Sequence, residues 1–164
     1  MEQQPGERRL AVFDLDGTLA DVAHRLHFLE PPRRDWNGFF RAASGDPPLA
    51  EGIALALRWA ETCDLGYVTG RPERCRRATE RWLRERGLPA APLWMRPDRD
   101  RRPARVLKPE LLADAARTRE IAVVVDDDAQ VCAAYRARSL PVVHATWAAA
   151  SRALERAQEE TGRT

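Results

Sequence analysis

The hydrophobic positions along the chain alternate between short apolar runs and longer segments with helical spacing. The short runs predict strands, because each is largely apolar and ends near polar or turn-forming residues: 10–14, 65–68, 92–95, 121–125 and 141–144. The longer segments predict helices over 51–63, 72–86, 109–117, 129–138 and 148–160. This alternation predicts an α/β fold, a three-layer Rossmann-like parallel sheet with helices on both faces.

A chain of 164 residues has the size of one domain. We expect a polar N-terminal tail over 1–8, a main domain over 9–147 and a C-terminal helix over 148–164. The main domain is expected to carry a small insert at about 21–50, after the first strand. Three aromatic residues of this insert have helical spacing and predict a buried face: Trp36, Phe39 and Phe40.

Polar side chains follow three of the predicted strands: Asp14 with Asp16, Thr69, and Asp126 with Asp127. Ligands bind at the carboxyl ends of the strands in an open parallel sheet, so these side chains are expected to meet at one edge. Asp14 and Asp16 are two positions apart and would project to the same side of an extended chain. Four carboxylates this close repel one another unless a cation or protons compensate. An oxygen-only set without His or Cys suits Mg²⁺ and does not resemble a zinc site.

This arrangement suits phosphoryl chemistry. A carboxylate can attack phosphorus and form an aspartyl phosphate, and a second carboxylate can protonate the leaving oxygen and later deprotonate water. Thr69 offers a hydroxyl and Lys108 an ammonium to the phosphoryl oxygens. Lys108 is the single lysine among 27 basic residues, which suggests a position that needs a compact point charge.

Composition narrows the protein class. The three cysteines are odd in number and far apart, which excludes a disulfide framework and is typical of reduced thiols in the cytoplasm. No apolar run approaches the roughly 20 residues that span a bilayer, and Met1–Arg9 lacks the apolar core of a signal peptide. We therefore expect a cytoplasmic protein without a membrane partner.

The net charge is only +2, but arginines concentrate at 71–86 and 96–105. Such segments can attract phosphates, and the arginine-rich stretch 96–105 directly precedes Lys108. A solvated helix face and a solvated loop are the competing interpretation of the same charges.

The segment Phe13–Leu19 resembles the signature of the haloacid dehalogenase superfamily of phosphohydrolases. The superfamily's other three motifs are matched, in order and in strand context, by Thr69, Lys108 and Asp126-Asp127. The resemblance implies that Asp14 is the nucleophile and Asp16 the general acid and base, with Thr69 and Lys108 holding the phosphoryl group.

The same resemblance implies a Mg²⁺ site. Its ligands would be Asp14, the backbone carbonyl of Asp16, and Asp126, with Asp127 close or bound through water.

A narrower resemblance, over roughly 9–140, is to the 3′-phosphatase domain of bacteriophage and bacterial polynucleotide kinases. It is carried by His24-Arg25, Asp35-Trp36, Val68-Thr69-Gly70-Arg71, Met95-Arg96 and Asp126-Asp127-x-x-Gln130. It implies that Arg25 and Arg71 handle phosphate, and His24 and Gly70 are further candidates for substrate binding.

Two positions depart from that family's pattern. The family usually has Asp four residues before the motif lysine, where Ala104 stands here. It often has Arg after the paired aspartates, where Asp128 stands and is predicted to be a helix N-cap.

The predicted substrate is a terminal phosphate, foremost a 3′-phosphate, on a polynucleotide or nucleotide. Neither gap between the motifs has room for a full cap domain, which leaves the site open to polymers. The sequence contains no GxxxxGK[ST], so ATP-dependent phosphorylation by a P-loop is excluded and a kinase or ligase would be a separate partner.

Two alternatives remain at this stage. One is the same chemistry on a small phosphorylated metabolite, and the other is a non-catalytic nucleic-acid-binding relative, suggested by Ala104 and Asp128. The choice between DNA and RNA and the oligomeric state are left open.

Overall fold

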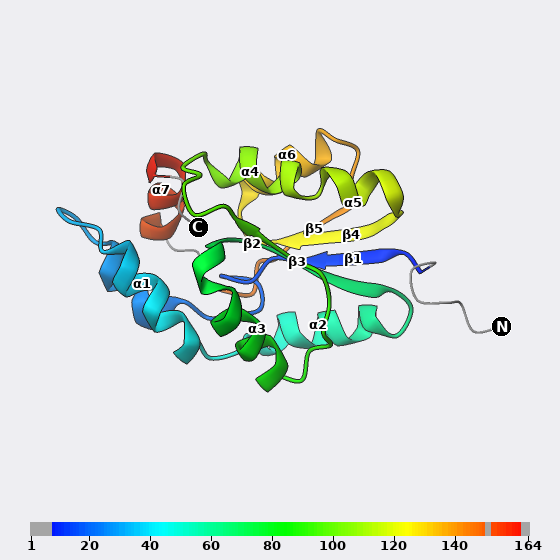
Figure 1. Cartoon of the computed structure of the whole chain (residues 1–164), viewed down its shortest axis with the longest axis horizontal. Coiled ribbons are helices and arrows are strands. Elements are labelled where there is room, and N and C mark those ends of the chain that lie inside the picture. The colour runs from blue at the N-terminus through cyan, green and yellow to red at the C-terminus, as the bar shows by residue number, and fades with distance from the viewer. Residues whose placement is uncertain (1–7, 150–151, 162–164) are drawn as a thin grey trace.

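The computed structural model describes residues 8–149 and 152–161 (Figure 1). Nearly all of the polar tail expected at 1–8 lies outside this part, as do 150–151 and 162–164 of the expected C-terminal segment. Within the described ranges, no helix combines the length and apolar character needed to cross a bilayer.

The centre of the molecule is a five-stranded sheet in the order β3-β2-β1-β4-β5, in which all neighbours are parallel. Its strands are β1 (Leu10–Phe13), β2 (Asp64–Pro72), β3 (Leu93–Arg96), β4 (Ile121–Asp126) and β5 (Val142–His144). All five predicted strands are therefore confirmed. The central strand β1 is buried along its whole length and pairs with β2 and β4, which explains its uninterrupted apolar sequence.

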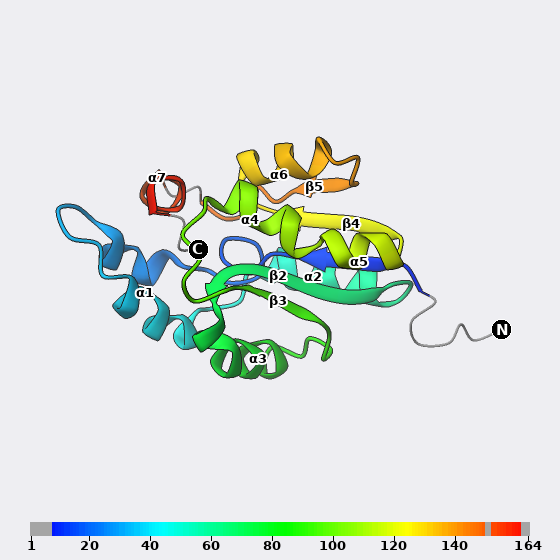
Figure 2. The ribbon, with the colours of Figure 1, turned by 45° about the horizontal axis from the view of Figure 1, so that its top comes forward.

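Helices cover both faces of this sheet (Figures 1 and 2). One face carries α4 (Ala104–Leu111), α5 (Ala113–Thr118) and α6 (Ala129–Arg136). The other carries α2 (Ala50–Ala60) and α3 (Arg76–Glu85). The predicted three-layer α/β architecture is confirmed.

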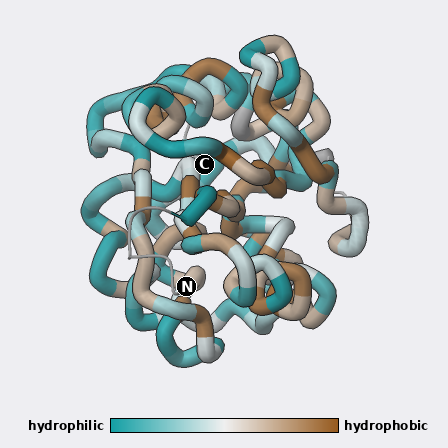
Figure 3. Tube along the Cα trace, turned by 90° about the vertical axis from the view of Figure 1, so that its right-hand side faces the viewer, coloured by the Kyte–Doolittle hydropathy of each residue, from teal (hydrophilic) through white to brown (hydrophobic). Residues whose placement is uncertain are grey.

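Two apolar cores form because alternate residues of β1 face opposite layers. Ala11 and Phe13 pack toward α2 and α3, together with Trp82, whereas Leu10 and Val12 pack toward α4 and α6. In Figure 3 the hydrophobic segments accordingly run through the middle of the molecule and the hydrophilic ones lie outside.

The segment between β1 and α2 folds into the 3₁₀ helices η1 (Ala23–Leu29) and η2 (Ala43–Gly45), with α1 (Trp36–Ala42) between them. The three aromatic residues predicted to share a buried face of α1 are buried: Trp36, Phe39 and Phe40. They form a third apolar cluster that includes Leu154 and Ala157 of α7 (Arg152–Thr161). Both α1 and α7 lie beyond the carboxyl ends of the strands (Figure 1).

Two predicted helix boundaries were wrong. Pro72 does not open a helix: its backbone is extended, it ends β2 opposite Arg96, and the 3₁₀ helix η3 (Glu73–Cys75) leads into α3. The helix predicted from Pro109 begins at Ala104 instead, contains Pro109 in its interior, and is followed by a separate α5. Pairing of Pro72 with Arg96 and packing of Ala104 in the core decide these two boundaries.

Candidate active site

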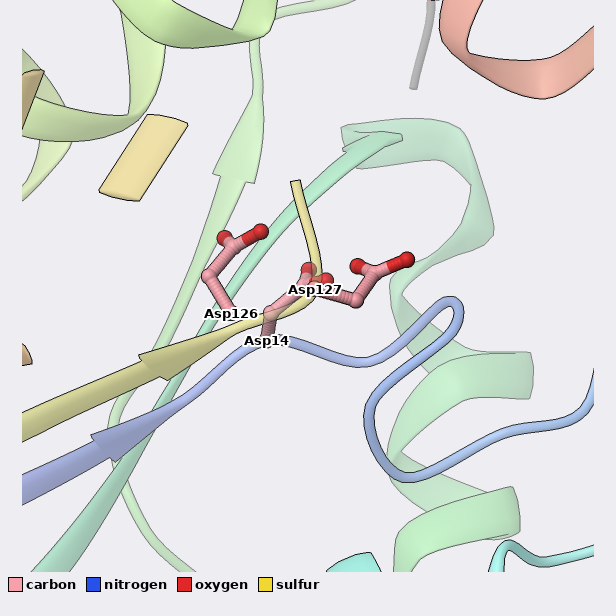
Figure 4. Close-up of side chains that lie close together, drawn as sticks. All are labelled: Asp14, Asp126 and Asp127. Atoms are coloured by element: carbon pink, nitrogen blue, oxygen red, sulfur yellow. The ribbon is translucent and has the colours of Figure 1, made fainter. Parts of the chain in front are cut away.

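An acidic cluster forms where β1 and β4 end side by side, from Asp14, Asp126 and Asp127 (Figure 4). One carboxylate oxygen from each of the three lies within 4.8 Å of the others. The backbone N–H of Asp14 donates to the carbonyl of Val125 at 2.9 Å, which fixes the two strand ends together. Asp14 and Asp126 are buried, whereas Asp127 is half-buried and points away from Asp126, toward the loop that follows Asp14.

Lys108 projects from α4 into this acidic cluster. Its Nζ donates to Asp14 Oδ1 and to Asp126 Oδ2, each at 2.8 Å, and the side chain is almost completely buried. Burial alone would lower the pKa of Lys108, but Asp126 and Asp14 outweigh burial and hold its pKa well above the usual value. The ammonium therefore stays charged and bridges residues from two strands.

One ammonium does not balance three carboxylates. Burial, reinforced by the charge of Asp14, raises the pKa of Asp126 to about 7. Burial also raises the pKa of Asp127 well above its usual value, and raises that of Asp14 despite the neighbouring Lys108. The excess negative charge and the all-oxygen donor set fit a hard divalent cation such as Mg²⁺.

The loop after β1 depends on two glycines. Gly17 has a φ of +84°, and a Cβ on it would lie 2.1 Å from Asp127 Oδ2, so a side chain there would displace the acidic cluster. A Cβ on Gly52 would lie 2.0 Å from the carbonyl oxygen of Thr18, because α2 begins directly against this loop. Thr18 in turn donates its Oγ1 to Asp14 Oδ2 at 3.4 Å.

Asp16 belongs to a different group of charges, which we call the arginine–carboxylate cluster: Asp16, Arg25, Arg71 and Asp46. Asp16 Oδ1 accepts from Arg25 Nη2 at 2.8 Å and from Arg71 Nε at 3.0 Å. Asp46 accepts from Arg25 Nε at 2.7 Å and from Arg71 Nη2 at 3.0 Å. All four side chains are buried.

The sequence predicted that Asp14 and Asp16 project to the same side of an extended chain, but their carboxylates bind different partners. β1 ends at Phe13, and the turn around Gly17 begins immediately, so the two-residue period of a strand no longer applies. Only the backbone carbonyl of Asp16 was implied as a metal ligand, and its side chain is not part of the acidic cluster.

The environment of Asp16 is correspondingly different. Burial would raise the pKa of its carboxyl, but the guanidinium groups of Arg25 and Arg71 outweigh burial and hold the pKa well below its usual range. Its second oxygen, Oδ2, is buried and has no hydrogen-bond partner. Such an orphaned oxygen is costly unless another group binds it.

Asp46 is the residue that sequence reasoning missed. It stands between Gly45 and Pro47, where it looks like an ordinary turn residue. Its Oδ1 also lies 2.8 Å from His24 Nε2, and its carbonyl oxygen accepts from Trp82 Nε1 at 2.8 Å. His24 therefore reaches the site through Asp46, and its side chain is 41% exposed.

Thr69 and Gly70 lie near the end of β2, and both are buried. Thr69 Oγ1 accepts from the backbone N–H of Arg71 at 3.1 Å, where the pairing of β2 with β3 shifts in register, and Arg71 reaches Asp16 from there. The carbonyl of Gly70 accepts from Arg96 Nε at 3.0 Å.

The arginine-rich stretch 96–105 is less open to phosphates than its sequence indicates. Arg96 is completely buried and holds the stretch to β2 through Gly70. Arg102 pairs with Asp100 and Glu110, and Arg105 pairs with Glu159 of α7. Much of this charge is therefore neutralised within the molecule.

The two positions that depart from the family pattern have structural roles. Ala104 is buried at the start of α4, in the core beside Tyr135. Asp128 Oδ1 accepts from the backbone N–H groups of Gln130 and Val131, at 2.8 and 3.3 Å. The predicted N-cap role of Asp128 is confirmed.

Comparison with known proteins identifies the family. A family model for the phosphatase domain of polynucleotide kinase PNKP matches residues 8–148. No curated protein sequence matches this chain significantly.

Among solved structures, a chain in the Pnkp1/Rnl/Hen1 RNA repair complex superposes with a TM-score of 0.72 at 23% identity, covering 87% of this chain and 44% of that one. The class C acid phosphatase from Bacillus anthracis with tungstate bound superposes with a TM-score of 0.58 at 20% identity, covering 74% of this chain and 53% of that one. The haloacid dehalogenase-like protein SP0104 from Streptococcus pneumoniae superposes with a TM-score of 0.62 at 13% identity, covering 94% of this chain and 92% of that one. At these identities the likeness shows the fold.

This chain spans about half the length of the chains that it matches in the Pnkp1/Rnl/Hen1 complex. The family model nevertheless covers most of the residues described, and the fold is that of haloacid dehalogenase-type hydrolases. The chain therefore belongs to the phosphatase-domain family of polynucleotide kinase PNKP, a haloacid dehalogenase-type phosphatase family.

Proposed function

We propose that this chain is a Mg²⁺-dependent phosphohydrolase that removes a terminal 3′-phosphate from a polynucleotide or nucleotide through a phospho-Asp14 intermediate. We also propose a cytoplasmic location, where thiols stay reduced, because all three cysteines are free: Cys63, Cys75 and Cys132.

The observation that carries this proposal is the contrast between Asp14 and Asp16. Asp14 lies against the Lys108 ammonium and two further carboxylates, whereas Asp16 is held by two arginines and keeps one oxygen unpartnered. The two carboxylates therefore have different partners, which suits them to two different tasks in one reaction. Asp14 then serves as nucleophile and Asp16 as proton donor and acceptor.

The acidic cluster is the proposed Mg²⁺ site. Asp14, Asp126 and the backbone carbonyl of Asp16 would hold the ion, with Asp127 close or bound through water. When bound, Mg²⁺ neutralises charge on the phosphoryl oxygens and on the acidic cluster itself. The remaining chemistry belongs to the side chains of this chain.

In the first step an oxygen of Asp14 attacks phosphorus, and the bond from phosphorus to the leaving oxygen breaks. The leaving oxygen takes a proton from Asp16, whose unpartnered Oδ2 is the free position for it. The phosphate brings negative charge toward Arg25 and Arg71, which weakens their hold on Asp16 and lets its pKa rise. Lys108 and Thr69 hold the phosphoryl oxygens.

In the second step Asp16 takes a proton from water, and the water oxygen attacks the phosphorus of phospho-Asp14. The bond between phosphorus and the Asp14 oxygen breaks, which releases inorganic phosphate and restores the Asp14 carboxylate, while the proton taken from water restores the protonated Asp16. Nothing besides water is consumed.

The family match supports a polynucleotide end as substrate, as does the RNA repair complex among the solved relatives. The segment before α2 contains only η1, α1 and η2, so no large cap closes over the acidic cluster from there. We propose that the chain works beside a kinase or ligase, because a chain similar to it belongs to the Pnkp1/Rnl/Hen1 RNA repair complex.

The test is phosphate release with Mg²⁺ from matched oligonucleotides, 3′-phosphorylated or 5′-phosphorylated, and from an aryl phosphate. We expect release from the 3′-phosphorylated oligonucleotide and none from its 5′-phosphorylated counterpart. Asp14→Asn should abolish it, by about 10⁴-fold or more, because the amide is not a nucleophile.

Two results would contradict the proposal. Turnover of the aryl phosphate alone would point to a small phosphorylated metabolite. Oligonucleotide binding without phosphate release in the wild type would point to a non-catalytic relative.

A further inference from the structure

A pocket of about 430 Å³ opens directly beside the acidic cluster. It shares Gly17 and Asp127 with the site, and its walls are formed by the loop after β1, the start of η1, the segment after β5 and α7. Figure 4 shows Asp127 pointing toward the loop that forms one of these walls. The pocket therefore adjoins the acidic cluster at Asp127.

The lining of this pocket is mostly apolar, with acidic groups at its edge. Val22, Leu26 and Leu49 provide aliphatic surface, and the half-buried Trp147 provides an aromatic ring. The charged residues that line it are carboxylates, those of Asp21 and Asp127. Carboxylates repel phosphates, so the pocket does not suit a nucleic-acid backbone. It suits an uncharged, flat, apolar group that carries hydrogen-bond donors at its rim.

Trp147 is fixed relative to the proposed nucleophile. Its Nε1 donates to the carbonyl oxygen of Thr18 at 2.8 Å, and the hydroxyl of Thr18 donates to Asp14 Oδ2 at 3.4 Å. The indole is thus tied to the same loop that positions Asp14. A ligand packed on this ring would have a defined place relative to the reacting atoms.

We propose that this pocket holds the nucleobase of the terminal, phosphorylated nucleotide, packed against Trp147. The inference rests on the proposed function and adds to it the part of the substrate that is recognised besides the phosphate. Nucleobases stack on aromatic side chains whatever their sequence, and their amino groups can donate to Asp21 or Asp127. The volume lies within the range of small-molecule sites in proteins.

A binding measurement tests this inference independently of phosphate release. In an Asp14→Asn background, which keeps the phosphate intact, we would titrate a 3′-phosphorylated oligonucleotide whose last residue carries a base. The matched ligand has an abasic tetrahydrofuran at that residue, and a 3′-phosphorylated mononucleotide tests whether the base needs a polymer. We expect the terminal base to lower Kd roughly tenfold relative to the matched abasic ligand, both in the oligonucleotide and in the mononucleotide.

Trp147→Ala should remove this preference, so that oligonucleotides with and without the terminal base bind alike. Trp147→Phe keeps a ring but loses the hydrogen bond to Thr18, and should keep most of the preference. Trp59→Ala is the matched control, because Trp59 of α2 is also half-buried and packs against the same core as Trp147, but does not line the pocket. It should leave the preference unchanged.

Equal binding of the two oligonucleotides by the Asp14→Asn parent would overturn the inference. So would an equal loss of affinity for both oligonucleotides in Trp147→Ala and Trp147→Phe, because that result means that Trp147 only holds the Thr18 loop in place. Failure of the proposed function would be seen separately, as absence of phosphate release by a wild type that still prefers the base.

Discussion

The acidic cluster and the arginine–carboxylate cluster each take one carboxylate from the loop after β1, Asp14 and Asp16 respectively, but they differ in how their buried charges are balanced. The acidic cluster sets three carboxylates against Lys108 alone, and the pKa values of its carboxyls are raised. The arginine–carboxylate cluster sets two carboxylates against two guanidinium groups, and the pKa of Asp16 is lowered.

This difference separates a site with excess buried negative charge from one whose charges are balanced. Excess buried negative charge is destabilising until a cation or protons reach it. A balanced network of charge-assisted hydrogen bonds is instead preorganised, and it holds Asp16 with one oxygen free. The predictions below test the two clusters separately.

The largest expected effect on stability is that of Asp46→Ala. It leaves Arg25 and Arg71 buried with Asp16 as their remaining carboxylate, and should lower the free energy of unfolding by about 3–5 kcal/mol. Urea denaturation measures this loss. Glu159→Ala is the control, because its ion pair with Arg105 is exposed and should contribute less than about 1 kcal/mol. Similar losses in the two variants would show that the network is not a stabilising unit.

Lys108→Gln tests the acidic cluster. It removes the ammonium that donates to Asp14 and Asp126, and should lower kcat for phosphate release by about 10²–10³-fold. Lys108→Arg keeps the charge but not the compact shape, and should restore little of the rate. Wild-type kcat in Lys108→Gln would remove Lys108 from the proposed mechanism, and wild-type kcat in Lys108→Arg would show that its compact shape is not required.

Stability should depend on pH in opposite directions for the two clusters. The raised pKa of Asp126, about 7, means that the metal-free folded protein binds more protons than the unfolded chain between about pH 4 and 7, so stability falls as the pH rises through that window. The lowered pKa of Asp16 stabilises the folded protein at pH values above the pKa that Asp16 has in the unfolded chain. This stabilisation is lost as the pH falls through the pKa of Asp16 in the folded protein.

Mg²⁺ should therefore raise Tm little at pH 5.5 and by about 5–10 °C at pH 8, with the ion at a hundred times its Kd. Thermal unfolding with Mg²⁺ or a chelator measures this difference. Asp126→Asn should flatten the pH dependence of Tm measured with the chelator, and should remove most of the increase in Tm caused by Mg²⁺. The same Tm shift at both pH values would contradict the raised pKa values of the acidic cluster.

The smallest effect is expected for His24→Ala. His24 meets Asp46 from the solvent side, and its side chain is 41% exposed, so the change should cost less than about 1 kcal/mol of stability. Arg25 and Arg71 keep Asp46 in place, and kcat should fall less than about fivefold. A loss as large as that of Asp46→Ala would mean that His24 is an equal member of the arginine–carboxylate cluster.

Much of the fold could be predicted from local sequence. The strand from Ile121 is continuously apolar because both of its faces are covered, and a run of that kind identifies a buried parallel strand. The start of α4 could not be predicted, because its N-cap residue, Pro103, forms no side-chain cap hydrogen bond and so gives no start signal. Packing of Ala104 and Leu107 against the sheet and α6 fixes that helix instead.

The sequence by itself determined the loop after β1 and the strand ends, because an apolar strand, a turn at Gly17 and a following carboxylate are all properties of neighbouring residues. Only the tertiary structure decided how the charges are partnered. Asp46 meets Arg25 and Arg71 across 21 and 25 residues, and Asp14 and Asp16 separate although they are two positions apart. The physical reason is that a buried charge is stabilised by whichever opposite charge folding brings within hydrogen-bond distance, and a local pattern does not encode that distance.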